Sequence, residues 1–260
     1  MTRLSQHPAF LPLQGGINFR DMGGQRGADG REIRKGKLLR SGALHQVTPE
    51  DLSYLGTIPL SLVLDYRDPS EVSRSPNRLS VNARYINAPA NPLTTDASAK
   101  ITAFSADKLD EVDGEQYMLE LYRQLPFNNP AYKQLAQLLA NPFDGALLQH
   151  CAVGKDRTGV GSALTLLTLG CDSTTVMEEY LLTHGMLTQV EEEILGWLGD
   201  ELSDRARHNL SNLLTVRESY LSAALEAILQ RYPSTDAWLE QEYQLTPAVR
   251  AEIQSRLLAE

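Results

Sequence analysis

The chain has 260 residues, a hydrophobic content of 42% and a charged content of 22%, values that are ordinary for a soluble globular protein. Its net charge of −9 argues against a nucleic-acid partner held by general attraction to phosphate. No stretch approaches the ~20 apolar residues of a membrane helix, so we expect no integral membrane association. An anionic protein that handles phosphate must create its positive potential locally.

The two cysteines, Cys151 and Cys171, flank a segment that predicts a helix. At ~1.5 Å rise per residue this helix spans about 18 Å. A disulfide requires Cα atoms within about 7 Å, so we expect two free thiols, with a structural role for Cys171. Free thiols and the lack of a signal-peptide pattern favour a cytoplasmic protein. Export without a cleaved signal is the alternative.

The first half of the chain alternates predicted strands and helices. The candidate strands are 36–41, 61–66, 84–88 and 146–150. Thr48 and Pro49 open one helix, because threonine is a favoured N-cap and proline suits the first helical position. Residues 130–139 predict a second helix with an apolar stripe. This alternation is typical of a mostly parallel sheet that is covered by helices on both faces.

Residues 91–126 interrupt this alternation. Most of the segment is rich in Ala, Ser, Thr and Asp, with only scattered large apolar side chains. A long, weakly patterned segment inside a compact domain is usually functional or mobile. We therefore expect a partly helical lid or insertion over residues 91–126.

The chain beyond Arg157 predicts helices almost throughout. Residues 158–169 are apolar on nearly every side, which indicates a buried helix with Gly170 at its C-terminal cap and Ser173 as the next N-cap. Amphipathic segments follow at 188–198, 205–214, 216–232, 235–240 and 246–258. Since neither a repeat nor a linker is evident, we predict a single domain over residues 1–260. The predicted fold class is α/β, with a small, mostly parallel central sheet, flanking helices, additional C-terminal helices and the lid-like insertion.

The segment His150 to Gly159, which reads H-C-A-V-G-K-D-R-T-G, carries the chemistry. Five residues separate Cys151 from Arg157, between a buried strand and an apolar helix. In such a turn, successive backbone N–H groups form an anion nest, and the helix N-terminus adds partial positive charge. Arg157 can grip two phosphate oxygens with its planar fork. The expected phosphate-binding residues are Ala152, Val153, Gly154, Lys155, Asp156 and Arg157.

Cys151 is the expected nucleophile. A free thiol has a pKa of about 8.5, whereas cysteines near helix N-termini or cations fall to about 3.5–7.5. The thiolate would attack phosphorus in line and form a phosphocysteine, and the Thr158 hydroxyl would ease departure of the sulfur in the second step. The alternative, a buried core thiol, does not account for the full ten-residue string.

Supporting roles fall to residues around this loop. We expect His150 to orient the loop through hydrogen bonds, and Arg20 and Asp21 to brace it from the N-terminal segment. Lys155 would either raise the local potential for multiply phosphorylated or lipid substrates or be solvated.

The loop resembles the signature of the protein-tyrosine phosphatase superfamily, H-C-x-x-G-x-x-R-[ST]-G. Its Lys-Asp-Arg centre is similar to that of a bacterial branch of tyrosine, dual-specificity and phosphoinositide phosphatases. Further similar blocks are 18–21, 37–41, 65–67 with Glu71, 122–124, 179–181 and 216–221. The resemblance implies a phosphatase of the predicted fold that acts on phosphotyrosine, with phosphoserine, phosphothreonine or phosphoinositides as further candidate substrates, and that works without a metal or cofactor. Its partners would be a phosphorylated protein or a phosphoinositide, and its product inorganic phosphate.

The proton donor is less evident. The leaving oxygen needs a proton, which these enzymes take from an aspartic acid. The resemblance places this acid just after the third strand, where the chain has Asn91, an amide without a labile proton. The candidates are therefore Asp156 inside the loop, then Asp96 in the predicted lid, and then Asp65, which can equally be structural through Arg67.

Two rival functions use the same loop. A sulfurtransferase also places a cysteine in an anion-binding loop, but the Thr158-Gly159 helix start and the long C-terminal helices favour a phosphatase. A pseudophosphatase would bind phosphorylated partners without turnover. Intact Cys151 and Arg157 favour turnover.

Overall fold

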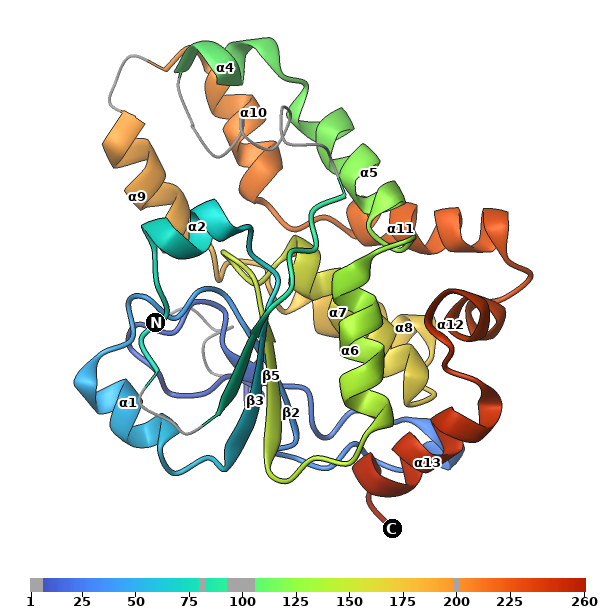
Figure 1. Ribbon diagram of the computed structural model, residues 1–260. Helices are drawn as coiled ribbons and strands as arrows, with labels where there is room; N and C mark the ends of the chain where they lie inside the picture. The colour runs from blue at the N-terminus through green and yellow to red at the C-terminus, as the bar shows by residue number, and fades with distance from the viewer. Residues whose placement is uncertain (1–6, 80–82, 93–105, 199–201) are drawn as a thin grey trace.

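The structure is a computed structural model that describes residues 7–79, 83–92, 106–198 and 202–260 (Figure 1). A five-stranded sheet lies at its centre in the order β1-β2-β5-β3-β4. The strands are β1 (Arg20–Asp21), β2 (Leu38–Ser41), β3 (Leu60–Asp65), β4 (Arg84–Asn87) and β5 (Ala146–His150). The β1–β2 pair is antiparallel and the other pairs are parallel, which confirms the predicted α/β fold with a mostly parallel sheet.

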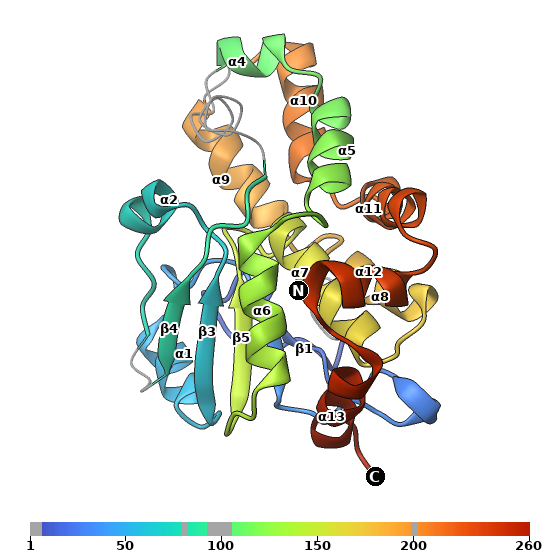
Figure 2. The same cartoon turned by 45° about the vertical axis from the view of Figure 1, so that its right-hand side comes forward.

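Helices surround the sheet and make up most of the C-terminal half of the chain (Figures 1 and 2). The helices are α1 (Pro49–Leu55), α2 (Pro69–Arg74), α4 (Ala106–Glu111), α5 (Gly114–Gln124), α6 (Pro130–Ala140), α7 (Asp156–Thr168), α8 (Ser173–Leu181), α9 (Thr188–Leu198), α10 (Asp204–Leu214), α11 (Glu218–Arg231), α12 (Thr235–Tyr243) and α13 (Pro247–Leu257), with a short 3-10 helix, η2, at Ala28–Gly30. In Figure 2, α6 passes in front of the sheet.

Both faces of the sheet are buried. Successive side chains of a strand point to opposite faces, so neighbouring leucines serve different cores. Leu38 and Leu147 belong to the larger core cluster, which includes residues of α6, α7 and the C-terminal helices. Leu39 and Leu148 belong to a smaller cluster with Leu55 of α1. The sheet therefore forms a fixed platform between two apolar layers.

The parallel strands bring polar residues together at their carboxyl ends. His150 is in register with Ser41 of β2 and with Asp65 of β3, and Asp65 is in register with Asn87 of β4. Cys151 directly follows His150. The predicted loop thus starts in the middle of the sheet, at the edge where ligands bind in open α/β folds.

Helix boundaries agree with the predictions where the cap chemistry is unambiguous. Thr48 caps α1 in a capping box with Asp51, and Thr246 caps α13 ahead of Pro247. The predicted N-cap at Ser173 is wrong by one residue, because the Asp172 carboxylate accepts the capping hydrogen bond from the Thr175 N–H. Aspartate and serine cap equally well, so sequence alone does not separate neighbours of this kind.

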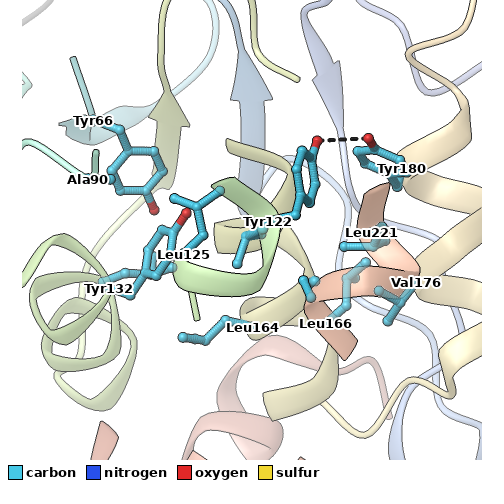
Figure 3. Packing of buried hydrophobic residues seen from close by; sticks show 14 of the residues in the cluster. Tyr66, Ala90, Tyr122, Leu125, Tyr132, Leu164, Leu166, Val176, Tyr180 and Leu221 are labelled. Carbon is cyan, nitrogen blue, oxygen red and sulfur yellow. Dashed lines mark hydrogen bonds between the residues drawn. The ribbon is translucent and has the colours of Figure 1, made fainter. Parts of the chain in front are cut away.

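The described part of the predicted insertion over 91–126 contains the helices α4 and α5. Helix α5 packs against α10 and α11, and Met118, Leu121 and Tyr122 of α5 belong to the larger core cluster. Figure 3 shows Tyr122 beside Tyr180 of α8, with a hydrogen bond of 2.7 Å between the hydroxyls. Residues 93–105, including Asp96, lie outside the described residues. In the described part of the chain, no helix has the length and apolar character needed to cross a membrane.

Candidate active site

The loop between β5 and α7 presents its carbonyl groups to the surrounding scaffold. The accepting oxygens are those of Cys151, Ala152 and Gly154. His150 Nδ1 donates to the Cys151 carbonyl at 3.1 Å, and the Ala43 N–H donates to the Ala152 carbonyl at 2.8 Å. The Gly154 carbonyl accepts two hydrogen bonds, from Asn18 Nδ2 at 2.9 Å and from Arg40 Nη2 at 2.7 Å. In a trans peptide the next N–H points the opposite way from the carbonyl, and the chain has no cis peptide bond within the described residues. The N–H groups of residues 152, 153 and 155 therefore face away from the scaffold.

These N–H groups have no acceptor in the described protein. Across the described ranges, no hydrogen bond is donated by the backbone N–H of any residue from 152 to 155. A row of unpaired N–H groups next to a helix N-terminus is the arrangement that binds an oxyanion. The loop thus has the unpaired N–H groups that an anion nest requires, and anion binding itself stays a prediction.

Gly154 is required at the tightest point of the loop. Its φ is +70°, and a Cβ at this position would lie 2.6 Å from the carbonyl carbon of Ser41. Both the left-handed backbone and the close approach to β2 demand glycine. The loop is therefore held against the end of the neighbouring strand.

Cys151 is buried and belongs to the larger core cluster. The residue is 1% exposed, whereas Ala152, Val153, Asp156 and Arg157 are half-buried and reach solvent. Thr158 is fully buried, and its Oγ1 has no hydrogen-bond partner within the described residues. Such an orphaned hydroxyl is rare, and it leaves a free donor one residue beyond Arg157.

The Arg157 guanidinium is held by a carboxylate from α2. Its Nη1 and Nη2 bond Glu71 Oε2 and Oε1 at 2.6 and 2.8 Å, and the two side chains are only 15% and 11% exposed. Burial alone would raise the pKa of Glu71, but the hydrogen bonds and charge of Arg157 hold it below its ordinary value. The Tyr132 hydroxyl also donates to the Arg157 carbonyl at 2.7 Å. The arginine is thus fixed at both its backbone and its head group.

A buried ionic cluster lies behind the loop. Glu179 of α8 accepts from Arg20 Nε at 2.7 Å and from Arg40 Nη1 at 2.5 Å. Although burial would raise the pKa of Glu179, the two guanidinium groups lower it. Arg20 also donates to the Asn18 side chain, and Arg40 to the Gly154 carbonyl. Arg20 therefore reaches the loop through Asn18, which donates to the Gly154 carbonyl, and its bracing role stays a prediction.

Asp21 needs a correction. Its two carboxylate oxygens accept from the N–H groups of Gly23 and Gly36, at 2.8 and 2.7 Å. These bonds tie two turns together at the start of β2, away from the loop. Asp21 stabilises the N-terminal turns and, among the described contacts, does not brace the loop.

His150 supports the Cys151 backbone, and its Nε2 lies 3.5 Å from Asp65 Oδ2. Asn77 Oδ1 accepts from the Leu44 N–H and from Arg67, so its Nδ2 donates to His150 Nε2 at 3.0 Å. The proton must then sit on Nδ1, which donates to the Cys151 carbonyl. Burial lowers the pKa of His150, and the neighbouring Asp65 carboxylate opposes this shift. The expected orienting role has a geometric basis.

Asp65 is structural in its surroundings. It is fully buried and bonds Arg67 through several contacts, the shortest 2.7 Å long, while the Tyr85 hydroxyl donates to it at 2.8 Å. Burial would raise the pKa of Asp65, but Arg67 holds it below its usual range. A carboxylate that stays ionised in this way is poorly suited to donate a proton.

Lys155 points away from the anion nest. Its fully buried Nζ donates to the carbonyls of Leu213 and Thr215 at 2.5 and 3.2 Å and lies 3.3 Å from Asp156 Oδ1. Burial lowers the pKa of Lys155. Asp156 Oδ1 also accepts from the Tyr122 hydroxyl at 2.8 Å. The idea of a solvated lysine is therefore wrong, because its ammonium ties the loop to the α10–α11 connection.

Several residues of the site had no role assigned from sequence. They are Asn18, Arg40, Glu71, Asn77, Tyr122, Tyr132 and Glu179. Some lie in the blocks that carry the family resemblance, which was the one available signal. Within the described residues, no group of three or more His, Cys, Asp or Glu side chains could hold a metal ion. A cavity of about 490 Å³, lined by Asn91, Glu120 and Arg231 among others, lies between the end of β4 and α5–α6.

Comparison with known proteins shows the family of this chain. Residues 11–259 match the family model described as "Tyrosine phosphatase family". A Cupriavidus necator protein with the name of a tyrosine-protein phosphatase is 30% identical over 244 residues, which are 90% of this chain and 87% of the relative. The triple specificity protein phosphatase PtpB of Mycobacterium tuberculosis is 28% identical over 261 residues, covering 89% of this chain and 93% of the relative.

A solved structure is also similar. It is that of a cysteine-to-serine variant of P. aeruginosa TpbA in complex with pTyr, with 18% identity, a TM-score of 0.32, and coverage of 84% of this chain and 98% of that chain. With a TM-score this low, the two structures do not superpose closely.

Proposed function

Because this chain belongs to the tyrosine phosphatase family and is an enzyme of that family, we propose that it hydrolyses phosphomonoesters through a phosphocysteine on Cys151. One observation carries the proposal. The N–H groups of residues 152–155 are unpaired within the described chain and adjoin an arginine that is fixed in place by Glu71. This loop can hold a dianionic phosphate in a protein whose net charge is −9.

The reaction takes two steps. The Cys151 thiolate attacks phosphorus, so that the S–P bond forms while the bond to the ester oxygen breaks, and the departing oxygen takes up a proton. Water then attacks the phosphocysteine, the S–P bond breaks, and inorganic phosphate leaves. Arg157 and the loop N–H groups stabilise the equatorial oxygens in both steps. The free Thr158 hydroxyl donates to the departing sulfur.

Phosphotyrosine is the first substrate we assign to this site. The name of one relative, a triple specificity protein phosphatase, motivates testing phosphoserine, phosphothreonine and phosphoinositides as well. The Lys155 ammonium is turned away from the loop, so it does not favour multiply phosphorylated substrates directly. Protein and lipid substrates must be separated by experiment.

The decisive experiment is a phosphate-release panel. It includes p-nitrophenyl phosphate, phosphotyrosine, phosphoserine and phosphothreonine peptides, and phosphoinositides. We expect Cys151→Ser to abolish release while retaining vanadate or phosphate binding, since the nest survives. Cys171→Ser is the matched control, because burial raises the pKa of that thiol to about 12 and we expect activity to persist. Equal activity of Cys151→Ser and the parent would end the nucleophile assignment.

The rival functions give different results in the same panel. A pseudophosphatase would bind phosphopeptides with no release from the parent protein. A sulfurtransferase would form thiocyanate from thiosulfate and cyanide without releasing phosphate. Cys151 and Arg157 are both intact, which favours turnover over binding alone.

A further inference from the structure

The residue that donates the proton in the proposed reaction is still to be assigned, and the N-terminus of α2 contains a candidate. Asp68 is the N-cap of α2 and is half-buried. Its own N–H donates to Glu71 Oε2 at 2.7 Å, the same oxygen that Arg157 Nη1 bonds at 2.6 Å. The Asp68 backbone N–H and the Arg157 guanidinium thus share one carboxylate oxygen of Glu71.

The other side of Asp68 faces the end of β4. Its carboxyl group forms a side-chain hydrogen bond with Asn91. Asn91 in turn lines the cavity of about 490 Å³ between β4 and α5–α6. Asp68 thus lies between Glu71, which holds Arg157, and Asn91, which lines this cavity.

We propose that Asp68 donates the proton to the leaving-group oxygen, which rests on the proposed phosphatase function. As the ester bond to phosphorus breaks, the Asp68 O–H transfers its proton to that oxygen, and the resulting carboxylate accepts a proton from the attacking water in the second step. Asn91, which stands where the family resemblance puts the acid, holds this carboxyl group by its amide.

The chemistry of Asp68 suits this role better than that of the other described aspartates near the loop. Burial raises the pKa of Asp68 most strongly and Glu71 adds to the rise, while Arg157 and the hydrogen bond with Asn91 oppose it. Asp65 is fully buried and held below its usual pKa range by Arg67, despite its burial. Asp156 is bound to Lys155 and Tyr122, on the side of α5 and α10.

The substitution Asp68→Asn tests this assignment cleanly. Asparagine caps a helix as well as aspartate does, so α2 and its contact to Glu71 should persist. The amide has no labile proton. We expect kcat/KM for phenyl phosphate, a poor leaving group, to fall by about 10²–10⁴-fold, the usual contribution of general acid catalysis. The loss for p-nitrophenyl phosphate should be much smaller, because its leaving group needs little protonation.

Two further variants complete the experiment. Asp144→Asn, at an exposed position in the α6–β5 connection, should match the parent on both substrates. Asp156→Asn should lower both rates by a similar factor. Should the leaving-group-dependent loss appear in Asp156→Asn and not in Asp68→Asn, the assignment to Asp68 is overturned. An active parent with an unchanged Asp68→Asn also overturns it, whereas a parent that releases no phosphate overturns the proposed function itself.

Discussion

The pair of Glu71 and Arg157 allows a sharp test of how the site is built. Substituting Glu71→Gln removes the negative charge but keeps an oxygen that can accept from the Asp68 N–H, so the start of α2 should survive. Glu71 makes two charge-assisted hydrogen bonds to Arg157, at 2.6 and 2.8 Å, and both side chains are largely buried. Loss of one such bond costs about 1.5–3 kcal/mol.

This cost should be visible in both stability and turnover. We expect urea unfolding to show a loss of about 1.5–3 kcal/mol. If the same free energy is lost from the transition state, kcat/KM for p-nitrophenyl phosphate falls by roughly 10- to 150-fold. Glu50→Gln, an exposed change in the first turn of α1, should stay within about 0.5 kcal/mol of the parent. A Glu71→Gln variant with parental stability and parental kcat/KM would refute the idea that this carboxylate positions Arg157.

Three further predictions concern the loop and its support. Gly154→Ala should lower the free energy of unfolding by about 1–2 kcal/mol, because alanine is strained in the left-handed backbone conformation of this position. It should also weaken competitive inhibition by phosphate at least about tenfold, and unchanged inhibition would contradict the loop geometry. Glu179→Gln should lower the free energy of unfolding by about 3–5 kcal/mol, because it leaves Arg20 and Arg40 buried without their counter-charge; a loss under about 1 kcal/mol in urea titrations would show that the cluster contributes little. The pKa of Glu179 is lowered in the folded state, so the stabilisation that this ionised carboxylate provides is complete above the unfolded-state pKa of about 4.3. This stabilisation is lost as the pH falls below that value. The parent should therefore lose more stability on acidification than Glu179→Gln does.

The fold could be predicted from local patterns. The strand at 146–150 and the helix at 188–198 have the predicted bounds. A short apolar run indicates the strand, and helical periodicity indicates the helix. The two-residue strand β1 was not predicted, because Arg20–Asp21 is too short to show a period and forms only by pairing with β2. Gly170 ends α7 with a φ of +81°, as its position after the apolar run predicts.

The site could be predicted only in part, for a physical reason. The ten-residue loop is local, and its chemistry can be inferred from spacing. The direction of the Lys155 side chain depends on carbonyls 58 and 60 residues away, and the partner of Arg157 lies 86 residues earlier in the chain. Long-range pairs of this kind leave no pattern in one sequence, so Glu71 was seen only as part of a similar block.

The central claim is that Cys151 becomes covalently phosphorylated during turnover. Rapid acid quenching of the parent with p-nitrophenyl phosphate, followed by peptide mass spectrometry, tests it directly. We predict that the peptide containing Cys151 gains the mass of one phosphoryl group, and that the peptide containing Cys171 does not. Phosphate release at full rate with an unmodified Cys151 peptide, or with the phosphoryl group on another residue, would contradict the account.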